Sequence, residues 1–390
     1  MSINKALYKA VTDCRASMLK DLEQFVNIDS PSGYETGMLE FQGLVIERMK
    51  AMGANITTKK VVSPMAGYNV KAVWQGKGKG RFLLLAHADT VWPVGTVAAR
   101  PFKIIGDKAY GPGVCDCKAG IVQILHVVEI LQNLSFEEFE SITFIMNPDE
   151  EKGSRQSRDF IRECARKQDV VFCCEAGKEP DIITVWRKGS GQLTVEVTGK
   201  SSHAGNSPEK GVNAVLELCH QISAISLLGD NEKGTTIQFT QIEGSKNPHN
   251  VIPAYAKAVS SVRVMSNDEF DRIESDAESV AAKPSVAGAM VNVLLHRNRP
   301  PMEVSAQGMK LVQLMQDIYC EDLQMELATG GSGGASDANL VADLCVVVDS
   351  VGIVGGNAHH EEEYLEIKSI VPRTYLLCKC IMEYGACQLQ

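Results

Sequence analysis

His87 and Asp89 stand inside an apolar run, LLLAHADTV at residues 83–91, where neither side chain belongs without a partner. The leucines predict a buried strand, and two residues apart on a strand the imidazole and the carboxylate leave by the same face. Such a pair either satisfies itself within the fold or begins a metal or catalytic site. The other motifs of the chain decide between these two interpretations.

Further acidic residues stand at the ends of predicted strands or in the loops that follow them. Asp116 lies in a Gly/Pro loop before a long helix, Glu150 and Glu151 follow a buried strand beside Asp149, and Glu175 ends another apolar strand. Taken singly, each has a simpler interpretation, such as an N-cap for Asp116 or a solvated loop for the adjacent acids. Three adjacent acids repel one another unless they are solvated or share cations.

A second Gly-rich loop near the end of the chain carries His359 and His360. With the earlier residues, it completes a set of imidazoles and carboxylates at strand ends, which converge on one edge of an open α/β sheet. Mixed imidazole and carboxylate ligands without thiolates are typical of catalytic zinc. The joint pattern therefore favours a metal-dependent enzyme.

The elements that must position these residues alternate between strand-like and helix-like patterns in the first half of the chain. Strands are predicted at 68–76, 80–88, 140–148 and 169–176, and helices at 1–25, 42–53, 118–134 and 156–164. This alternation predicts an α/β sheet with helices on its faces.

The pattern changes near residue 186, where alternation of period two begins, and strands and helices of an α+β type follow to residue 298. A chain of 390 residues also exceeds what one hydrophobic core usually supports. We therefore expect one domain of residues 1–185 and 301–390, split by an inserted domain of residues 186–300.

Composition excludes several classes of protein. A net charge of −9 gives no basic footprint for nucleic acid, and no apolar run approaches the length of a membrane span. The N-terminal segment has no signal-peptide core, and the 12 cysteines form no CxxC pair, so we expect reduced thiols and a cytoplasmic location. Cys115 and Cys117, which flank Asp116, are interpreted as packing residues, with mutual redox chemistry as the alternative.

Six segments together carry a resemblance to a known family: HADTV, GPGVCDCKAG, DEEKGS, SSHAG, NVIP and AHHEEEYLEI. In this order and spacing they resemble the co-catalytic di-zinc metallopeptidases and deacylases, which include glutamate carboxypeptidase, acetylornithine deacetylase, succinyl-diaminopimelate desuccinylase and the aminoacylases. The likeness is greatest to the glutamate carboxypeptidase branch. It implies an α/β fold, with a mixed-sheet catalytic domain and an inserted α+β lid that also forms a homodimer.

The resemblance also implies the metal ligands. Asp116 would bridge two Zn²⁺ ions, with His87 and Glu175 completing one site and Glu151 and His359 the other. Co²⁺ or Mn²⁺ would also serve. The acids then stop repelling one another, because two divalent cations lie among them.

Catalytic and substrate-binding roles follow from the same resemblance. Glu150 would be the general base that deprotonates a metal-bridging water, and Asp89 would accept the other ring N–H of His87 and fix its tautomer. His203 would reach across the dimer to hold the scissile carbonyl oxygen. The implied substrate contacts are Asn250, Arg263, Gly333, Gly334 and Ser336.

These roles predict a zinc-dependent amidohydrolase that cleaves the amide bond to an amino acid with a free carboxylate. The substrate would be a small peptide or an N-acyl amino acid. An N-acyl-amino-acid deacylase or a dipeptidase is the alternative within the same chemistry. The segment LATGGSGG lacks the arginine of glutamate-specific relatives, so no glutamate preference is predicted. A catalytically silent binding protein would have lost a ligand or the base, and the chain retains all of them.

Overall fold

The chain folds into two compact units in the computed structural model, which describes residues 3–244 and 248–386. The first unit comprises Met1–Trp186, Glu303–Gly331 and Ser336–Gln390, and the second comprises Arg187–Met302 and Ser332–Ala335. The last of these segments falls within the range 301–390 that was predicted for the catalytic domain. It joins the second unit because the backbone N–H of Lys188 donates to the carbonyl of Ser332 (3.0 Å).

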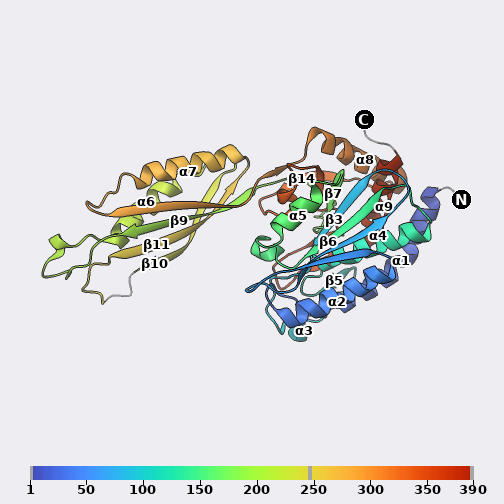
Figure 1. Ribbon diagram of the computed structural model, residues 1–390, viewed down its shortest axis with the longest axis horizontal. Helices are drawn as coiled ribbons and strands as arrows, with labels where there is room; N and C mark the ends of the chain where they lie inside the picture. Colours follow the sequence, from blue (N-terminus) through green and yellow to red (C-terminus); the bar gives the residue numbers. More distant parts are fainter. Residues whose placement is uncertain (1–2, 245–247, 387–390) are drawn as a thin grey trace. The chain divides into compact units, whose positions relative to one another are not determined.

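A mixed sheet of nine strands forms the centre of the first unit, counted over the described residues (Figure 1). Its order is β1-β2-β6-β3-β7-β15-β8-β13, with β14 paired to β8. The strands are β1 (Asn55–Lys60), β2 (Tyr68–Gln75), β3 (Arg81–His87), β6 (Ser141–Asn147), β7 (Val170–Cys173), β8 (Ile182–Arg187), β13 (Met302–Glu303), β14 (Ala328–Ser332) and β15 (Val346–Asp349). The predicted α/β fold is confirmed.

Strands β6, β3 and β7 are parallel neighbours near the middle of this sheet. Their side chains are almost wholly buried, as is usual for parallel strands in the middle of an α/β sheet. Parallel strands end at the same edge, so the residues that end or follow these strands are brought together there.

The helices of the first unit are α1 (Ile3–Val26), α2 (Glu35–Ala51), α3 (Thr96–Ala99), α4 (Lys118–Asn133), α5 (Arg158–Ala165), α8 (Ala306–Leu323) and α9 (Ile370–Ala386). Helices α1, α4 and α9 contact one another, and α4, which is apolar on nearly every face, also contacts β3 (Figure 1). Helix α2 begins earlier than the predicted residue 42. Gly37 lies in its first turn, and only a glycine fits there, because a Cβ would come 1.8 Å from the carbonyl oxygen of Asp29.

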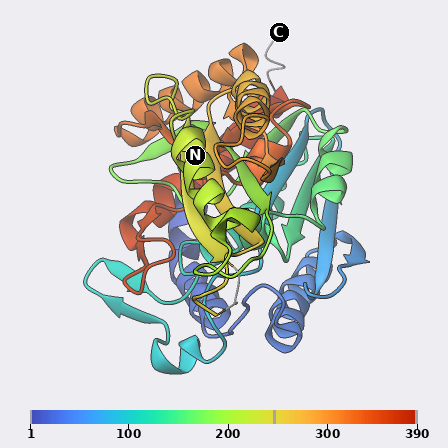
Figure 2. The ribbon, with the colours of Figure 1, turned by 90° about the vertical axis from the view of Figure 1, so that its left-hand side faces the viewer.

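A small second sheet in the same unit has the order β16-β17-β5-β4. Its strands are β4 (Lys103–Ile105), β5 (Lys108–Tyr110), β16 (Gly355–Gly356) and β17 (Tyr364–Glu366). The pairing of β17 with β5 places a segment late in the chain (red) beside one near residue 110 (cyan; Figure 2). The loops that leave β5 and enter β17 are therefore neighbours.

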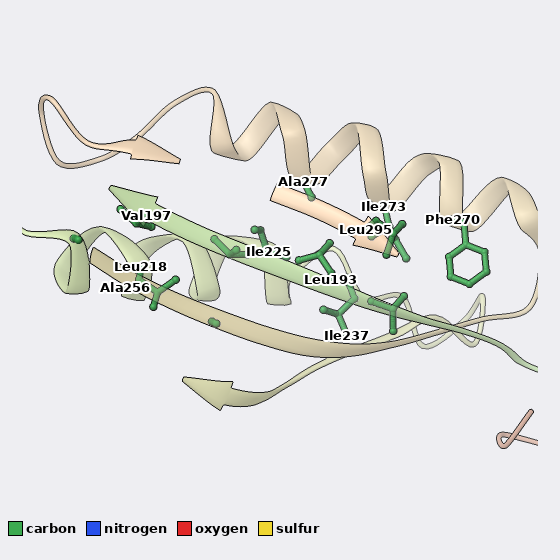
Figure 3. Close-up of a cluster of buried hydrophobic side chains, with 14 of the residues drawn as sticks. Leu193, Val197, Leu218, Ile225, Ile237, Ala256, Phe270, Ile273, Ala277 and Leu295 are labelled. Carbon is green, nitrogen blue, oxygen red and sulfur yellow. The ribbon is translucent and has the colours of Figure 1, made fainter. Parts of the chain in front are cut away.

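The second unit is a four-stranded antiparallel sheet of order β10-β11-β9-β12, with two helices on one face. Its strands are β9 (Gly189–Thr198), β10 (Thr236–Gly244), β11 (Tyr255–Val264) and β12 (Met290–Arg299), and its helices are α6 (Ala214–Ser226) and α7 (Asn267–Ala281). Leu193, Ile225 and Ile273 lie in the apolar core between sheet and helices (Figure 3). Alternation along β11 leaves every second side chain buried there.

Among the helices of the described residues, none combines the length and the apolar character that crossing a bilayer requires.

Candidate metal centre

His87 is the last residue of β3, and its side chain is 1% exposed. Its Nδ1 lies 2.9 Å from the backbone carbonyl of Asp89, and because a carbonyl can only accept, Nδ1 carries the hydrogen. The other ring nitrogen, Nε2, is then directed at the carboxylates of Asp116 (2.9 Å) and Glu175 (3.7 Å). A histidine held in this way by its second nitrogen is typical of a metal ligand.

Asp116 lies between two imidazoles, in the loop from β5 to α4. Its Oδ1 contacts His87, and its Oδ2 lies 3.2 Å from Nε2 of His359. Burial alone would raise the pKa of Asp116, but the hydrogen bonds from His359 and His87 outweigh it and hold that pKa below its usual value. The carboxylate therefore stays ionised and offers one oxygen to each side.

His359 and Glu151 complete this side of the cluster. Nε2 of His359 lies 3.1 Å from Oε2 of Glu151, and the two residues come from loops more than 200 positions apart. Hydrogen bonds to Asp116 and Glu151 raise the pKa of His359 to about 10, whereas burial raises the pKa of Glu151. Oε1 of Glu151 is buried and has no hydrogen-bond partner among the described residues.

The donor atoms form two overlapping groups that have the size of metal sites. His87, Asp116 and Glu151 form one, His87, Cys117 and Glu175 the other, and the atoms within each lie within 4.8 Å of one another. The buried Oε1 of Glu151, which has no hydrogen-bond partner among the described residues, suits a metal ligand, because a buried carboxylate oxygen without a partner is costly. The residues therefore fit one or more divalent cations.

Cys117, interpreted above as a packing residue, lies closer to this cluster than expected. It is fully buried, and its thiol donates to the backbone carbonyl of Cys174 (3.2 Å). Burial raises the pKa of Cys117 well above its ordinary value. The thiol is thus protonated and engaged within the fold.

The carboxylate of Asp89 lies near His87 and also contacts the turn that carries Glu150 and Glu151. Its carboxylate oxygen lies 3.5 Å from Nδ1 of His87, farther than its own backbone carbonyl. The same carboxylate accepts the backbone N–H groups of Glu150 and Glu151 (3.1 Å each) and the hydroxyl of Ser32 (2.6 Å). Asp89 therefore holds the turn that carries these two acids.

Sequence reasoning missed Ser32, and only the segment DSPSG around it carried a turn signal. Asp149, the third adjacent acid, turns away from the cluster and accepts hydrogen bonds from Gln156 (backbone N–H, 2.9 Å) and Ser157. The repulsion among the three adjacent acids is reduced because the carboxylate of Asp149 is hydrogen-bonded to Gln156 and Ser157.

The second unit contains three of the implied residues. His203 and Asn250 are exposed and lie side by side, since the N–H of Ala204 donates to the carbonyl of Asn250 (2.8 Å). Nδ1 of His203 accepts the backbone N–H groups of Gly205 and Asn206 (3.1 Å each), so Nε2 carries the hydrogen and remains available as a donor.

Arg263 on β11 is joined by an arginine that the sequence analysis missed. Arg263 and Arg299 on β12 both lie opposite Ser190 of β9, so all three side chains leave by the same face of the sheet. Burial and the positive charge of Arg299 lower the pKa of Arg263. Two guanidinium groups on one face are a natural site for an anion.

The glycine loop expected to bind substrate divides between the two units. Gly333 and Gly334 are exposed, and the carbonyl of Gly334 accepts the guanidinium of Arg187 (3.2 Å). Ser336 is buried, and its hydroxyl donates to Asp349 (2.6 Å) and caps a short helix. The Ser336 side chain is therefore engaged within the fold.

The raised pKa of His359 predicts how the metal-free protein responds to pH. Its folded pKa of about 10 exceeds the ordinary 6.5, so the contribution is fully present below pH 6.5 and is lost as pH rises through about 10. Because the side chain is 53% exposed, screening keeps the contribution at about 1 kcal/mol or less. In chelator, urea unfolding of wild type and His359→Gln should differ at pH 6 and converge only above about pH 10. A constant difference would contradict this account.

Comparison with protein families matches residues 83–383 to Peptidase family M20/M25/M40. Among curated relatives, carboxypeptidase G2 of Pseudomonas sp. (strain RS-16) is 34% identical over 98% of this chain and 93% of its own length. Succinyl-diaminopimelate desuccinylase of Rickettsia felis is 26% identical over 77% of this chain and 83% of its own.

Solved structures share the fold. Aminopeptidase PepT from Bacillus cereus superposes with a TM-score of 0.80 at 19% identity, covering 96% of this chain and 99% of its own. The Bacillus subtilis YXEP protein, described as a dinuclear metal binding peptidase, superposes with a TM-score of 0.71 at 14% identity, covering 96% and 99%.

Proposed function

The chain belongs to peptidase family M20/M25/M40, and from that premise we propose that it is a zinc-dependent carboxypeptidase-like enzyme. As a member of this family it is a hydrolase that acts on amide bonds, as the sequence predicted. The substrate that we propose is a small peptide or N-acyl amino acid in which the residue released has a free carboxylate.

One observation carries this proposal. Asp116 contacts His87 with one oxygen and His359 with the other, while Glu151 reaches the same His359. Three segments far apart in sequence thus bring imidazoles and carboxylates to a single carboxylate in the middle. That arrangement supports two metal positions that share Asp116.

Five residues would hold the two ions: His87 and Glu175 at one, Glu151 and His359 at the other, and Asp116 at both. We propose Zn²⁺ because imidazole with carboxylate suits it, although Co²⁺ and Mn²⁺ accept the same donors. When bound, such ions lower the pKa of water and polarise the scissile carbonyl.

Glu150 is the proton carrier in the proposed reaction. It is nearly buried, and its backbone is held by Asp89 through the same carboxylate that holds Glu151. In that position it takes the proton of the attacking water and gives it to the leaving nitrogen. His203 would donate from Nε2 to the carbonyl oxygen as negative charge develops on it.

Arg263 and Arg299 support a substrate with a free carboxylate. Two guanidinium groups on one face of the sheet repel each other, and an anion between them relieves the repulsion. A carboxylate also matches the planar fork of Arg. Asn250 lies beside His203 in the same unit and would bind the substrate's polar backbone.

A second candidate is hydrolysis of N-acyl amino acids, which the desuccinylase relative favours. Both candidates use the same chemistry and differ in the acyl side of the substrate. The glycine loop with Gly333 and Gly334 is a proposed substrate contact and would help to select the acyl group.

A substrate panel with metal analysis tests the proposal. The purified protein should contain two equivalents of metal. It should release amino acids from dipeptides with a free C-terminal carboxylate or from N-acyl amino acids. Substrates whose C-terminal carboxylate is amidated should be at least about tenfold poorer, because they lose a charged hydrogen-bonded contact. Failure to cleave either class after loading with Zn²⁺, Co²⁺ or Mn²⁺ would overturn the proposal.

We also propose that residues 187–302 form the lid and the dimer contact, and that His203 acts on the site of the partner. The protein should then be a homodimer in sedimentation equilibrium, and forms held monomeric by dilution should hydrolyse poorly. Full activity in a proven monomer would exclude the trans arrangement. A cytoplasmic location completes the proposal, since cysteines among the described residues are free thiols.

A further inference from the structure

Glu363 is a buried acid that the proposed reaction does not use. It is 1% exposed and stands between two exposed glutamates and β17, four residues after His359. In the sequence it is indistinguishable from its neighbours Glu361 and Glu362. A carboxylate buried in this way requires hydrogen-bond donors, because a carboxylate without partners is costly inside a protein.

Four N–H groups supply that compensation. Oε1 of Glu363 accepts the backbone N–H groups of Cys115 (3.0 Å) and Asp116 (3.1 Å). Oε2 accepts the backbone N–H of Gly113 (2.9 Å) and the indole N–H of Trp92 (3.0 Å). These four donors match the acceptor capacity of an ionised carboxylate.

These partners come from two segments that carry the metal centre. Residues 113–116 form the loop that ends in Asp116, and Trp92 follows the His87–Asp89 segment. Glu363 itself belongs to the loop that presents His359. One carboxylate therefore ties together the three segments whose side chains meet at Asp116.

The pairing of β17 with β5 does not by itself achieve this. Its register ends at Tyr364 and Tyr110, so the loop beyond Tyr110 leaves the small sheet before it reaches Asp116. Three backbone N–H groups of that loop converge on the carboxylate of Glu363, as in an anion-binding nest. The orientation of the Asp116 backbone thus depends on this carboxylate.

We propose that Glu363 is a positioning residue that sets the distance between Asp116 and His359 and so tunes metal binding at the position they share. This inference rests on the proposed function, because that proposal assigns Asp116 and His359 as ligands. Loss of a partner that orients a metal ligand costs about 10–100-fold in metal affinity or activity.

Glu363→Gln is the sharpest test, because it keeps the size of the side chain and puts an NH₂ group where N–H donors point. Zn²⁺ affinity, measured by competition with a chromophoric chelator, should fall about 10–100-fold. Amide hydrogen exchange of a peptide that covers residues 113–116 should accelerate at least about tenfold in the metal-free protein, since the protecting acceptor is lost. Glu362→Gln, an exposed neighbour, should change neither measurement by more than about twofold.

Unchanged Zn²⁺ affinity and exchange in folded Glu363→Gln would overturn the inference, since a residue that merely stabilises the fold would leave the metal affinity of the folded protein intact. If Glu363→Gln fails to fold, Trp92→Phe decides. It removes one donor from the same carboxylate and should weaken Zn²⁺ binding by a smaller factor, about 3–10-fold. No change in Trp92→Phe would then overturn the inference.

Both readouts are independent of substrate turnover. If the protein cleaves none of the proposed substrates, the proposed function fails, while Glu363→Gln still reports on metal binding and on the loop. If the protein is active but Glu363→Gln binds metal normally, only the inference fails.

Discussion

Glu150→Gln should keep both metal ions and lower kcat by about 10²–10⁴-fold. The glutamine side chain has nearly the same size, but it cannot accept a proton. Glu150 is 8% exposed, and Asp89 holds its backbone N–H at 3.1 Å, so the substitution leaves the turn in place. Metal content by mass spectrometry and kcat at saturating substrate measure the two halves of this expectation.

The adjacent acid supplies the matched control. Glu151→Gln alters the residue that contacts His359, so it should lower the metal content of the protein and leave the proton carrier Glu150 in place. The two neighbouring variants therefore separate proton transfer from metal binding. Near-normal kcat in Glu150→Gln would remove Glu150 from the role of base.

Asp116→Asn should lower metal content and reduce kcat/KM by about 10³-fold or more, because metal ions supply several kcal/mol of transition-state stabilisation. The amide has one oxygen and no charge, whereas Asp116 offers an oxygen to His87 and another to His359. The two metal positions that are proposed to share this residue should weaken together. Isothermal titration with Zn²⁺ measures the number of sites and their affinities.

Asp107→Asn is the control for this substitution, because Asp107 is exposed at the turn of the β4–β5 hairpin. It should bind metal and turn over substrate within about twofold of wild type. If Asp116→Asn retains two sites of unchanged affinity, Asp116 does not bridge, and the two-metal arrangement would need another shared ligand.

The metal centre illustrates how far a sequence can lead. Apolar runs predicted strands at 80–88, 140–148 and 169–176, which carry His87, precede Glu150 and carry Glu175, because buried parallel strands are continuously apolar. Parallel strands share an edge, so the sequence predicted that these residues meet. Asp116 and His359 lie in loops and joined the same pattern of strand-end residues, but the family resemblance was needed to assign the role of each ligand.

Other features depended on contacts between residues distant in sequence. Helix α2 begins at Glu35, and Gly37 in its first turn leaves room for the carbonyl of Asp29, whereas a glycine near a helix start weakens the helical pattern of the sequence. Segment 332–335 joins the second unit through Lys188, a contact across more than 140 positions. Neither is visible in local periodicity.

The sequence by itself determined which residue types were available and which strand ends would meet, because these follow from local patterns of burial. Only the tertiary structure decided what each acid does. Of the neighbours Asp149 and Glu151, the first caps a turn and the second faces His359. Of the neighbours Glu362 and Glu363, the first is exposed and the second is buried against the Asp116 loop. Their chemistry is the same in the sequence, and they differ only in the N–H groups and imidazoles that folding brings to each carboxylate.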